Sequence, residues 1–303
     1  MDLTSLKTIK ELLLKYSVHL SKRMGQNFLV NKNVLEKIIK TADLKPDDIV
    51  LEVGPGIGTL TQELAKTAGK IITVEKDRKM VEILNETLNE NINNSCAKKS
   101  TIIDFLTQLK NVEIINSDIL KISNFKFQIS NYKVVANLPY YIASPVIRKF
   151  LETKTPPEIM VLMLQKEVAQ RICAKPPKMS LLAVSVQFYA KPEIISYVSK
   201  NCFWPSPKVD SAIIKITPAS FRRGPTSIQL DRGRASNQLF FDIVKAGFSQ
   251  PRKQLINNLS KTLKLDKKKT NDWLLKNKIN STQRAETLSI EDWQNLTKTF
   301  PKI

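Results

Sequence analysis

The chain has 303 residues, of which 42% are hydrophobic, so it is long enough for one large domain or for a main domain with an appendage. Its 48 lysines and arginines exceed its 28 acidic residues and give a formal net charge of +20, which favours a polyanionic partner, nucleic acid first, although a lysine-rich proteome produces the same excess. The single histidine, His19, argues against a histidine-based catalytic triad or zinc site, so we expect no metal. The three cysteines show neither disulfide pairing nor metal-ligand spacing, which indicates a reducing cytosol.

The first predicted element is an amphipathic helix within residues 1–17. Leu6, Ile9, Leu13 and Tyr16 recur there at helical spacing, and polar and acidic residues interrupt the apolar pattern. We therefore expect a helix and not a secretory signal peptide. No run approaches the roughly eighteen apolar residues of a membrane span, so none is predicted.

Residues 49–165 alternate between short β-rich runs and helical patterns. The runs are IVLEVG, IITVE, VEIIN, VVANL and IMVLML, and the segments TLTQELAKTA and RKMVEILNETL carry apolar residues three and four apart. This alternation predicts an α/β fold with a doubly wound parallel sheet, which binds ligands at the carboxyl ends of its strands. Two later runs, LLAVSVQFYA (181–190) and DSAIIKIT (210–217), are predicted to extend the sheet.

Two segments depart from this pattern. Residues 91–111 begin as a polar, Asn-rich stretch, and we interpret them as a surface insertion without a catalytic role. From residue 218 a basic connector is followed only by helical patterns, and residues 218–303 hold 17 basic and 7 acidic residues. The sequence thus predicts a sheet domain, residues 1–217, and a small all-helical domain, residues 218–303.

A glycine-rich turn follows the first strand of the predicted sheet. Three of the eight glycines in the chain, Gly54, Gly56 and Gly58, lie in LEVGPGIGTL. Glycines at this position allow a sharp turn and a close approach of the backbone to a ligand. The dinucleotide pattern G-x-G-x-x-G fails because Thr59 stands at its third position; the sequence reads E-x-G-x-G-x-G, with Glu52 leading.

Carboxylates end the next two strands. Glu75 lies 21 residues after Gly54, where a carboxylate can accept both hydroxyls of a ribose, and Asp118 ends the third strand, where it can accept from an adenine amino group. Each alone is equally well explained as a solvated strand end. The glycine turn and both carboxylates together predict a ligand with an adenosyl group.

The fourth strand ends in Asn137-Leu138-Pro139-Tyr140. These are ordinary turn residues, because Pro139 removes a backbone donor and fixes φ. They also have a chemical interpretation, since an amide and carbonyls beside an aromatic ring can hold a flat heterocycle that carries an amino group.

Six motifs occur in one order: GQNFL (25–29), EVGPGIG (52–58), NLPYY (137–141), LQKEVAQR (164–171), FWPSPKVDSA (203–212) and FSQPRKQLINNLS (248–260). In these motifs the chain resembles the bacterial small-subunit (16S) rRNA adenine N6,N6-dimethyltransferase family, from about residue 20 to about residue 290. The large-subunit methylases of erythromycin resistance are a sister branch, but the last motif and RAETLS (284–289) resemble the small-subunit branch. The chain departs from the family at 91–111 and at Met179-Ser180, where the family tends to show Tyr-Gly.

The resemblance implies a Rossmann-like class I methyltransferase fold and S-adenosylmethionine as cofactor and methyl donor. It implies that two adjacent adenines near the 3′ end of small-subunit rRNA, in a pre-ribosomal particle, each receive two N6-methyl groups. We expect a cytoplasmic, monomeric enzyme. The implied cofactor-binding residues are Gln26, Asn27, Leu29, Gly54, Gly56, Glu75, Asp118 and Asn137.

The resemblance also gives the Asn137–Tyr140 turn a catalytic role. The Asn137 side-chain oxygen and the Leu138 carbonyl would accept from the adenine amino group, and Pro139 would fix the turn. Tyr140 would stack on the base, and Phe203 would lie on the opposite face. Both aromatic rings could instead be ordinary core residues.

Three basic pairs are expected to contact RNA. Lys22-Arg23 lies beside the GQNFL motif, and Arg222-Arg223 lies in the basic connector. Arg252-Lys253 is predicted in the first turn of a helix with Pro251 at its first position, where cations oppose the helix dipole and so suggest a phosphate partner. The alternative is that such cations are merely exposed and tolerated.

Three other functions remain possible from the sequence. One is a large-subunit methylase of the resistance type. Another is a non-catalytic ribosome-assembly factor on the same fold, against which the intact motif residues argue. A DNA adenine methylase is disfavoured because Leu138 stands where those enzymes have a proline.

Overall fold

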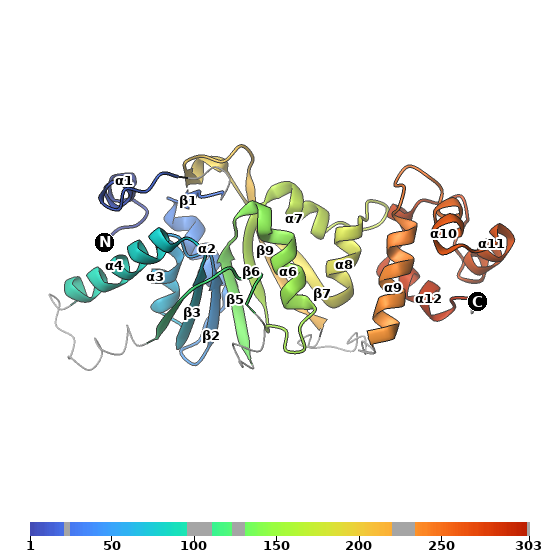
Figure 1. The fold of residues 1–303 in the computed structure, drawn as a ribbon, viewed down its shortest axis with the longest axis horizontal. Helices are drawn as coiled ribbons and strands as arrows, with labels where there is room; N and C mark the ends of the chain where they lie inside the picture. Colours follow the sequence, from blue (N-terminus) through green and yellow to red (C-terminus); the bar gives the residue numbers. More distant parts are fainter. Residues whose placement is uncertain (21–24, 96–110, 123–130, 220–233, 302–303) are drawn as a thin grey trace. The chain divides into compact units, whose positions relative to one another are not determined.

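The computed structural model describes residues 1–20, 25–95, 111–122, 131–219 and 234–301 (Figure 1). The chain forms two compact units. The sheet unit comprises Met1–Ala169 and Glu193–Pro218, and the helical unit comprises Gln170–Pro192 and Ala219–Ile303. Residues 170–192, which were expected in the first domain, therefore pack with the helical unit.

The main sheet is mixed and has the strand order β4-β3-β2-β5-β6-β9-β7. Strands β2 to β6 pair in parallel, and β9 runs antiparallel to β6. The chain moves outward from β2 to β4 and then returns to place β5 on the other side of β2, so the topological switch lies between β2 and β5. The bounds are β2 Ile49–Val53, β3 Lys70–Glu75, β4 Val112–Asn116, β5 Tyr132–Asn137, β6 Met160–Gln165, β7 Ala190–Val198 and β9 Ser211–Pro218.

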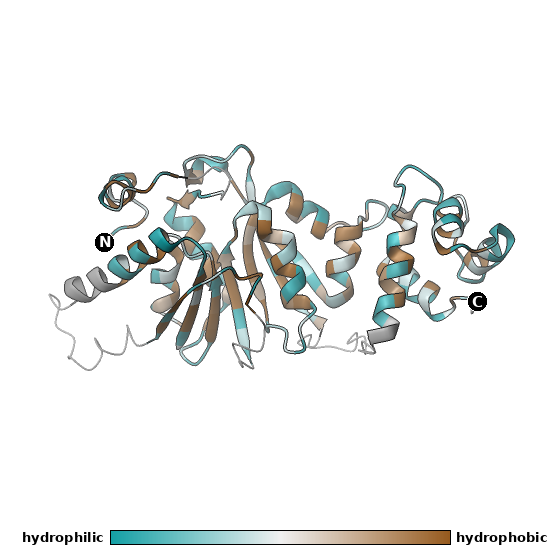
Figure 2. Cartoon of the chain, viewed as in Figure 1, coloured by the Kyte–Doolittle hydropathy of each residue, from teal (hydrophilic) through white to brown (hydrophobic). Residues whose placement is uncertain are grey.

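Helices pack on both faces of this sheet because its strands are apolar on both faces. Val135 belongs to a core cluster with residues of α2 and α3. Side chains alternate along a strand, so Tyr132 points to the opposite face, where its ring centroid lies 6.4 Å from that of Phe150 in α6. Figure 2 shows the strands largely in the hydrophobic colour. The bounds of these helices and of two neighbours are α2 Lys32–Ala42, α3 Thr59–Ala65, α4 Arg78–Ser95, α6 Ala143–Leu151 and α7 Lys166–Ile172.

The predicted N-terminal helix is confirmed as α1, Leu6–Lys15. Ile9 and Leu13 are buried in a core cluster with Met80 of α4. Leu6, expected on the same face, is 44% exposed, whereas Leu12 is buried beside Ile9 and Leu13. In the part of the chain that the structure describes, no helix is long and apolar enough to cross a membrane.

A short antiparallel ribbon joins two motifs that lie far apart in the sequence. Strand β1, Phe28–Leu29, belongs to the GQNFL motif, and β8, Phe203–Trp204, opens the FWPSPKVDSA motif. Phe28 pairs with Trp204, and Leu29 pairs with Phe203. The ribbon thereby brings Phe203 to the GQNFL loop.

The prediction of a strand at residues 181–190 is wrong, because this segment forms helix α8, Leu181–Tyr189. The Ser180 hydroxyl caps the helix by accepting from the Ala183 backbone N–H at 3.1 Å. The Phe188 ring stacks on Phe240 of the helical unit, with 4.1 Å between centroids. A continuous apolar run does not distinguish a buried strand from a buried helix.

The helices after residue 233 surround a core that includes Leu255, Leu259 and Trp293. The prediction that a helix begins at Pro251 is wrong: the helix begins at Leu255, after Gln254, and residues 249–253 form turns. The Asn258 amide fixes these turns by donating to the backbone carbonyls of Gly247 and Gln250. The bounds are α9 Arg234–Gly247, α10 Leu255–Leu263, α11 Lys267–Lys276 and α12 Ile290–Lys298.

Candidate active site

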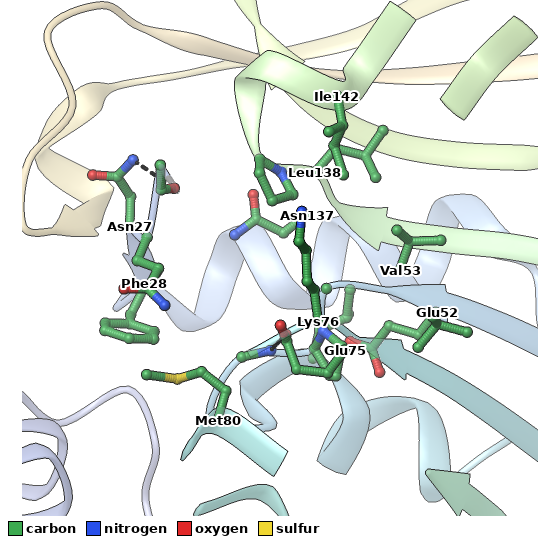
Figure 3. A pocket seen from close by; sticks show the side chains of 18 of the residues that line it. Asn27, Phe28, Glu52, Val53, Glu75, Lys76, Met80, Asn137, Leu138 and Ile142 are labelled. Atoms are coloured by element: carbon green, nitrogen blue, oxygen red, sulfur yellow. Dashed lines mark hydrogen bonds between the residues drawn. The ribbon is translucent and has the colours of Figure 1, made fainter. Parts of the chain in front are cut away.

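A cavity lies in the sheet unit at the switch point between β2 and β5 (Figure 3). The carboxyl ends of β2, β3 and β5, the loops that follow them and the GQNFL loop meet there, as expected for an open parallel sheet. Every predicted cofactor-binding and catalytic residue lines it: Gln26, Asn27, Leu29, Gly54, Gly56, Glu75, Asp118, Asn137, Leu138, Pro139, Tyr140 and Phe203.

The glycine turn after β2 requires glycine for its backbone conformation. Gly54, Gly56 and Gly58 have φ values of +69°, +57° and +92°, in the left-handed region that other residues rarely adopt. A Cβ atom on Gly58 would lie 2.7 Å from Leu84 Cδ1. Gly54 and Gly56 therefore bring backbone without a side chain to the wall of the cavity.

Glu75 ends β3 and is held by backbone N–H groups. Its Oε2 accepts from Gly56 at 3.2 Å, and its Oε1 accepts from Asp77 at 2.8 Å. Burial raises the pKa of the Glu75 carboxyl, and these hydrogen bonds act in the opposite direction. The carboxylate is thus fixed at the cavity wall beside the glycine turn.

Glu52 is the second buried carboxyl of the site and is only 1% exposed. Its Oε2 accepts from the Thr61 hydroxyl at 2.7 Å. The pKa of Glu52 is raised to about 8, chiefly by burial; the Thr61 hydrogen bond opposes this rise, and the charge of Glu75 adds a smaller increase. Glu52 is therefore mainly protonated at neutral pH. The sequence signal was a glutamate inside the otherwise apolar strand IVLEV.

Asp118 follows β4 and has partners that the sequence did not predict. Its Oδ2 lies 3.0 Å from the Lys76 ammonium, and its Oδ1 accepts from the Leu120 backbone N–H at 3.0 Å. Partial burial alone would raise the pKa of the Asp118 carboxyl. The hydrogen bonds from Lys76 and Leu120 have the larger combined effect, so the pKa lies below its ordinary value. Lys76 also lines the cavity.

Asn137 is the last residue of β5, and its side chain faces the cavity in Figure 3. The next residue, Leu138, donates its backbone N–H to the Met163 carbonyl of β6 at 3.0 Å, which fixes the direction in which the chain leaves the sheet. Among the residues that the structure describes, none hydrogen-bonds to the Asn137 side-chain amide. This half-buried amide is therefore available to a bound molecule.

Two aromatic residues border the same turn. The Tyr140 hydroxyl lies 2.8 Å from that of Ser211, the fully buried first residue of β9, and the hydrogen bond between them fixes the ring. Phe203 is almost completely buried and packs in a core cluster with Leu29. Ser211 belongs to the FWPSPKVDSA motif, but the sequence did not show that it would bond to Tyr140.

The GQNFL loop closes one side of the cavity. The Gln26 amide donates to the Asp77 carboxylate at 2.9 Å. The Asn27 amide donates to the Gly25 carbonyl at 3.1 Å, the bond drawn as a dashed line at Asn27 in Figure 3. Phe28 is buried in a core cluster with Met80, and both side chains also line the cavity. In the described ranges, no three His, Cys, Asp or Glu residues form a group that could hold a metal.

The structure describes two of the six predicted RNA-binding residues, Arg252 and Lys253, and neither lines this cavity. Arg252 and Lys253 are exposed in the turn before α10, so the argument from the helix dipole does not apply to them. Lys22 and Arg23, and Arg222 and Arg223, lie outside the described residues, as do residues 96–110 of the predicted insertion.

Known structures with the same fold include two adenine or rRNA methyltransferases. A dimethyladenosine transferase from Plasmodium falciparum superposes with a TM-score of 0.68 at 26% identity, covering 88% of this chain and 95% of that one. The 23S rRNA methyltransferase ErmE gives a TM-score of 0.66 at 25% identity and covers 90% of this chain and 99% of that one.

Sequence relatives extend over nearly the whole chain. The Ribosomal RNA small subunit methyltransferase A of Dehalococcoides mccartyi is 42% identical over 291 residues, which cover 95% of this chain and 90% of that protein. Its namesake in Geobacillus kaustophilus is 37% identical over 313 residues, covering 100% of this chain and 98% of that protein. The family model described as ribosomal RNA adenine dimethylase matches residues 18–302, which include every motif that lines the cavity. The chain therefore belongs to the ribosomal RNA adenine dimethylase family.

Proposed function

We propose that the protein transfers methyl groups from S-adenosylmethionine to N6 of adenines in small-subunit rRNA, and that two adjacent adenines near the 3′ end each receive two. The observation that carries this proposal is the Asn137 amide, which ends β5 inside the cavity without a hydrogen-bond partner among the described residues. The names of relatives at 37% and 42% identity support the choice of small-subunit rRNA.

The residues of the cavity fit an adenosyl donor. Glu75 is a fixed acceptor for the two ribose hydroxyls, and the glycine turn leaves room for the donor against the backbone. Asp118 accepts from the adenine amino group of the donor, and Lys76 helps to keep its carboxylate ionised. Gln26, Asn27 and Leu29 close the site from the other side. S-adenosylmethionine, when bound, supplies a methyl group that its sulfonium has already activated.

Asn137 and Leu138 prepare the nucleophile. The lone pair of an adenine N6 is delocalised into the ring, so the nitrogen attacks poorly while the amino group stays planar. The Asn137 side-chain oxygen and the Leu138 carbonyl accept the two N–H groups and allow the nitrogen to become pyramidal. Asn137 has no basic atom near neutral pH, so catalysis rests on positioning, and the proton leaves to water afterwards.

Tyr140 and Phe203 hold the ring of the target base. Tyr140 supplies a stacking face, which is worth roughly 1–3 kcal/mol per base. Its hydrogen bond to Ser211 fixes the ring before the substrate arrives. Phe203 borders the opposite side of the base, and its burial with Leu29 keeps it in place.

The helical unit docks on the RNA in a pre-ribosomal particle. Arg252 and Lys253 are exposed and belong to a segment that the Asn258 amide fixes, so they can contact phosphates at a defined position. Lys22, Arg23, Arg222 and Arg223 are proposed as further phosphate contacts. Because the substrate is ribosomal RNA, the activity belongs in the cytoplasm, and the enzyme acts as a monomer.

One experiment tests the function. The protein is incubated with methyl-labelled S-adenosylmethionine and, in separate reactions, with unmodified small-subunit or large-subunit particles, and the RNA is digested to nucleosides. The expected product is labelled N6,N6-dimethyladenosine from small-subunit rRNA. Label in large-subunit rRNA alone would favour a resistance-type methylase, and particle binding without label would favour an assembly factor.

A further inference from the structure

The 3₁₀ turn Tyr140–Ile142 carries two consecutive tyrosines that differ sharply in environment. Both line the cavity. Tyr140 is half-buried and hydrogen-bonded to Ser211. Tyr141 is 53% exposed, and no residue in the described part of the chain hydrogen-bonds to its hydroxyl. The turn therefore presents one anchored ring inside the cavity and one solvent-exposed ring at its rim.

Tyr141 shares this rim with a cation. Lys76 and Tyr141 line the same cavity, and the Lys76 ammonium is held 3.0 Å from the Asp118 carboxylate. An exposed aromatic face and a lysine at one site are the groups by which proteins bind single-stranded RNA, the ring for a base and the cation for the backbone.

We propose that Tyr141 is a substrate-positioning residue that stacks on the nucleotide next to the target adenine. This inference rests on the proposed function, because it assumes an RNA substrate whose target base leaves its stack. Extraction of a base deprives the neighbouring base of a stacking partner. An aromatic face at the rim replaces that partner and, with two adjacent adenines, holds one of them while the other occupies the Tyr140 side of the cavity.

The exposure of Tyr141 separates this role from packing. More than half of the side chain lies outside the protein, so its removal leaves little space inside the fold. Tyr197 is a matched control within the sheet unit because it is 52% exposed and does not line the cavity. Its ring centroid lies 5.1 Å from the Lys166 ammonium, so it too has a lysine nearby. A general effect of losing an exposed tyrosine would appear at both positions.

The test measures steady-state kinetics with unmodified small-subunit particles as the varied substrate. We expect Tyr141→Ala to lower kcat/KM for particles about tenfold, chiefly through KM, which is the effect of losing one stacked base. Tyr141→Phe should stay within about twofold of the wild type, because the ring and not the hydroxyl makes the contact. Tyr197→Ala should match the wild type, and calorimetric affinity for S-adenosylmethionine should be unchanged in all three variants.

Two results would overturn the Tyr141 role while the proposed function stands. In the first, Tyr141→Ala has wild-type kinetics; in the second, Tyr141→Phe is impaired as strongly as Tyr141→Ala. If Tyr141→Ala fails to fold, Tyr141→Leu replaces it and must show the same rise in KM. A wild-type protein that methylates no adenine would instead remove the proposed function, and the role of Tyr141 with it.

Discussion

Replacement of Glu52 by glutamine should stabilise the protein, and the gain should grow with pH. Glu52 is buried beside Glu75, and its pKa is raised to about 8 from an ordinary value of 4.5. Glutamine has nearly the same shape as a protonated glutamate, and its side-chain oxygen can still accept from Thr61. Unlike glutamate, it remains neutral at every pH.

The magnitude follows from linkage between protonation and folding. A carboxyl with a higher pKa in the folded state contributes full stability below its unfolded pKa, and this contribution is lost as pH rises through the folded pKa. For Glu52 the loss therefore occurs between pH 4.5 and about 8. At about 1.4 kcal/mol per pH unit, the loss in free energy of unfolding of the wild type reaches roughly 3 kcal/mol at pH 7 and roughly 5 kcal/mol above pH 8.

Urea denaturation from pH 5 to pH 9 measures this effect. The free energy of unfolding of Glu52→Gln should exceed that of the wild type by an amount that grows by about 1.4 kcal/mol per pH unit up to about pH 8. The control is Glu113→Gln, which removes a half-exposed carboxylate 3.0 Å from Lys70 and should leave the pH dependence unchanged. Parallel pH profiles for wild type and Glu52→Gln would refute the assignment of a protonated, buried Glu52.

Two further substitutions test the donor site and the RNA contacts. Glu75→Ala should lose at least tenfold in affinity for S-adenosylmethionine, because each hydrogen bond to a charged group contributes about 1.5–3 kcal/mol; unchanged calorimetric affinity would argue against the ribose role. Arg252→Glu combined with Lys253→Glu should weaken binding to small-subunit particles and flatten its salt dependence, while donor affinity and melting temperature stay near those of the wild type. An unaltered salt slope would show that these exposed residues do not contact phosphate.

The position of the site could be predicted from the sequence because it follows from sheet topology. Glu75 and Asn137 end predicted strands, the glycine turn and Asp118 lie at the ends of two others, and the carboxyl ends of parallel strands meet at one edge of a sheet. The five runs between residues 49 and 165 are the strands β2 to β6, which confirms the predicted alternation. Local pattern and one topological rule were sufficient for these features.

The remaining features depend on contacts that a local pattern does not contain. The pairing of Leu29 with Phe203 joins segments that precede and follow strands β2 to β6 in the sequence, and the Tyr140–Ser211 hydrogen bond is also long-range. The protonation state of Glu52 depends on its burial, which cannot be deduced from the presence of a glutamate at this position of the sequence. Helix α10 begins at Leu255 and not at the predicted Pro251, because the Asn258 amide stabilises a turn before it. The presence of Pro251 alone did not indicate this turn.

The same limit explains the error at residues 181–190. The run contains valines and aromatic residues that favour strands, and its apolar character is nearly continuous. Its helical state is decided by packing on Phe240 and other residues of the helical unit, which come more than fifty positions later. Ser180 was the one local signal for a helix, as its N-cap.

The most direct test of the central claim is the nucleoside analysis of small-subunit rRNA after incubation with wild-type protein or with Asn137→Ala. We expect N6,N6-dimethyladenosine with the wild type. We expect almost none with Asn137→Ala, although that variant should bind S-adenosylmethionine within several-fold of the wild type, because only the acceptor for the N6 amino group has been removed. Near-normal dimethyladenosine formation by Asn137→Ala would remove Asn137 from the mechanism.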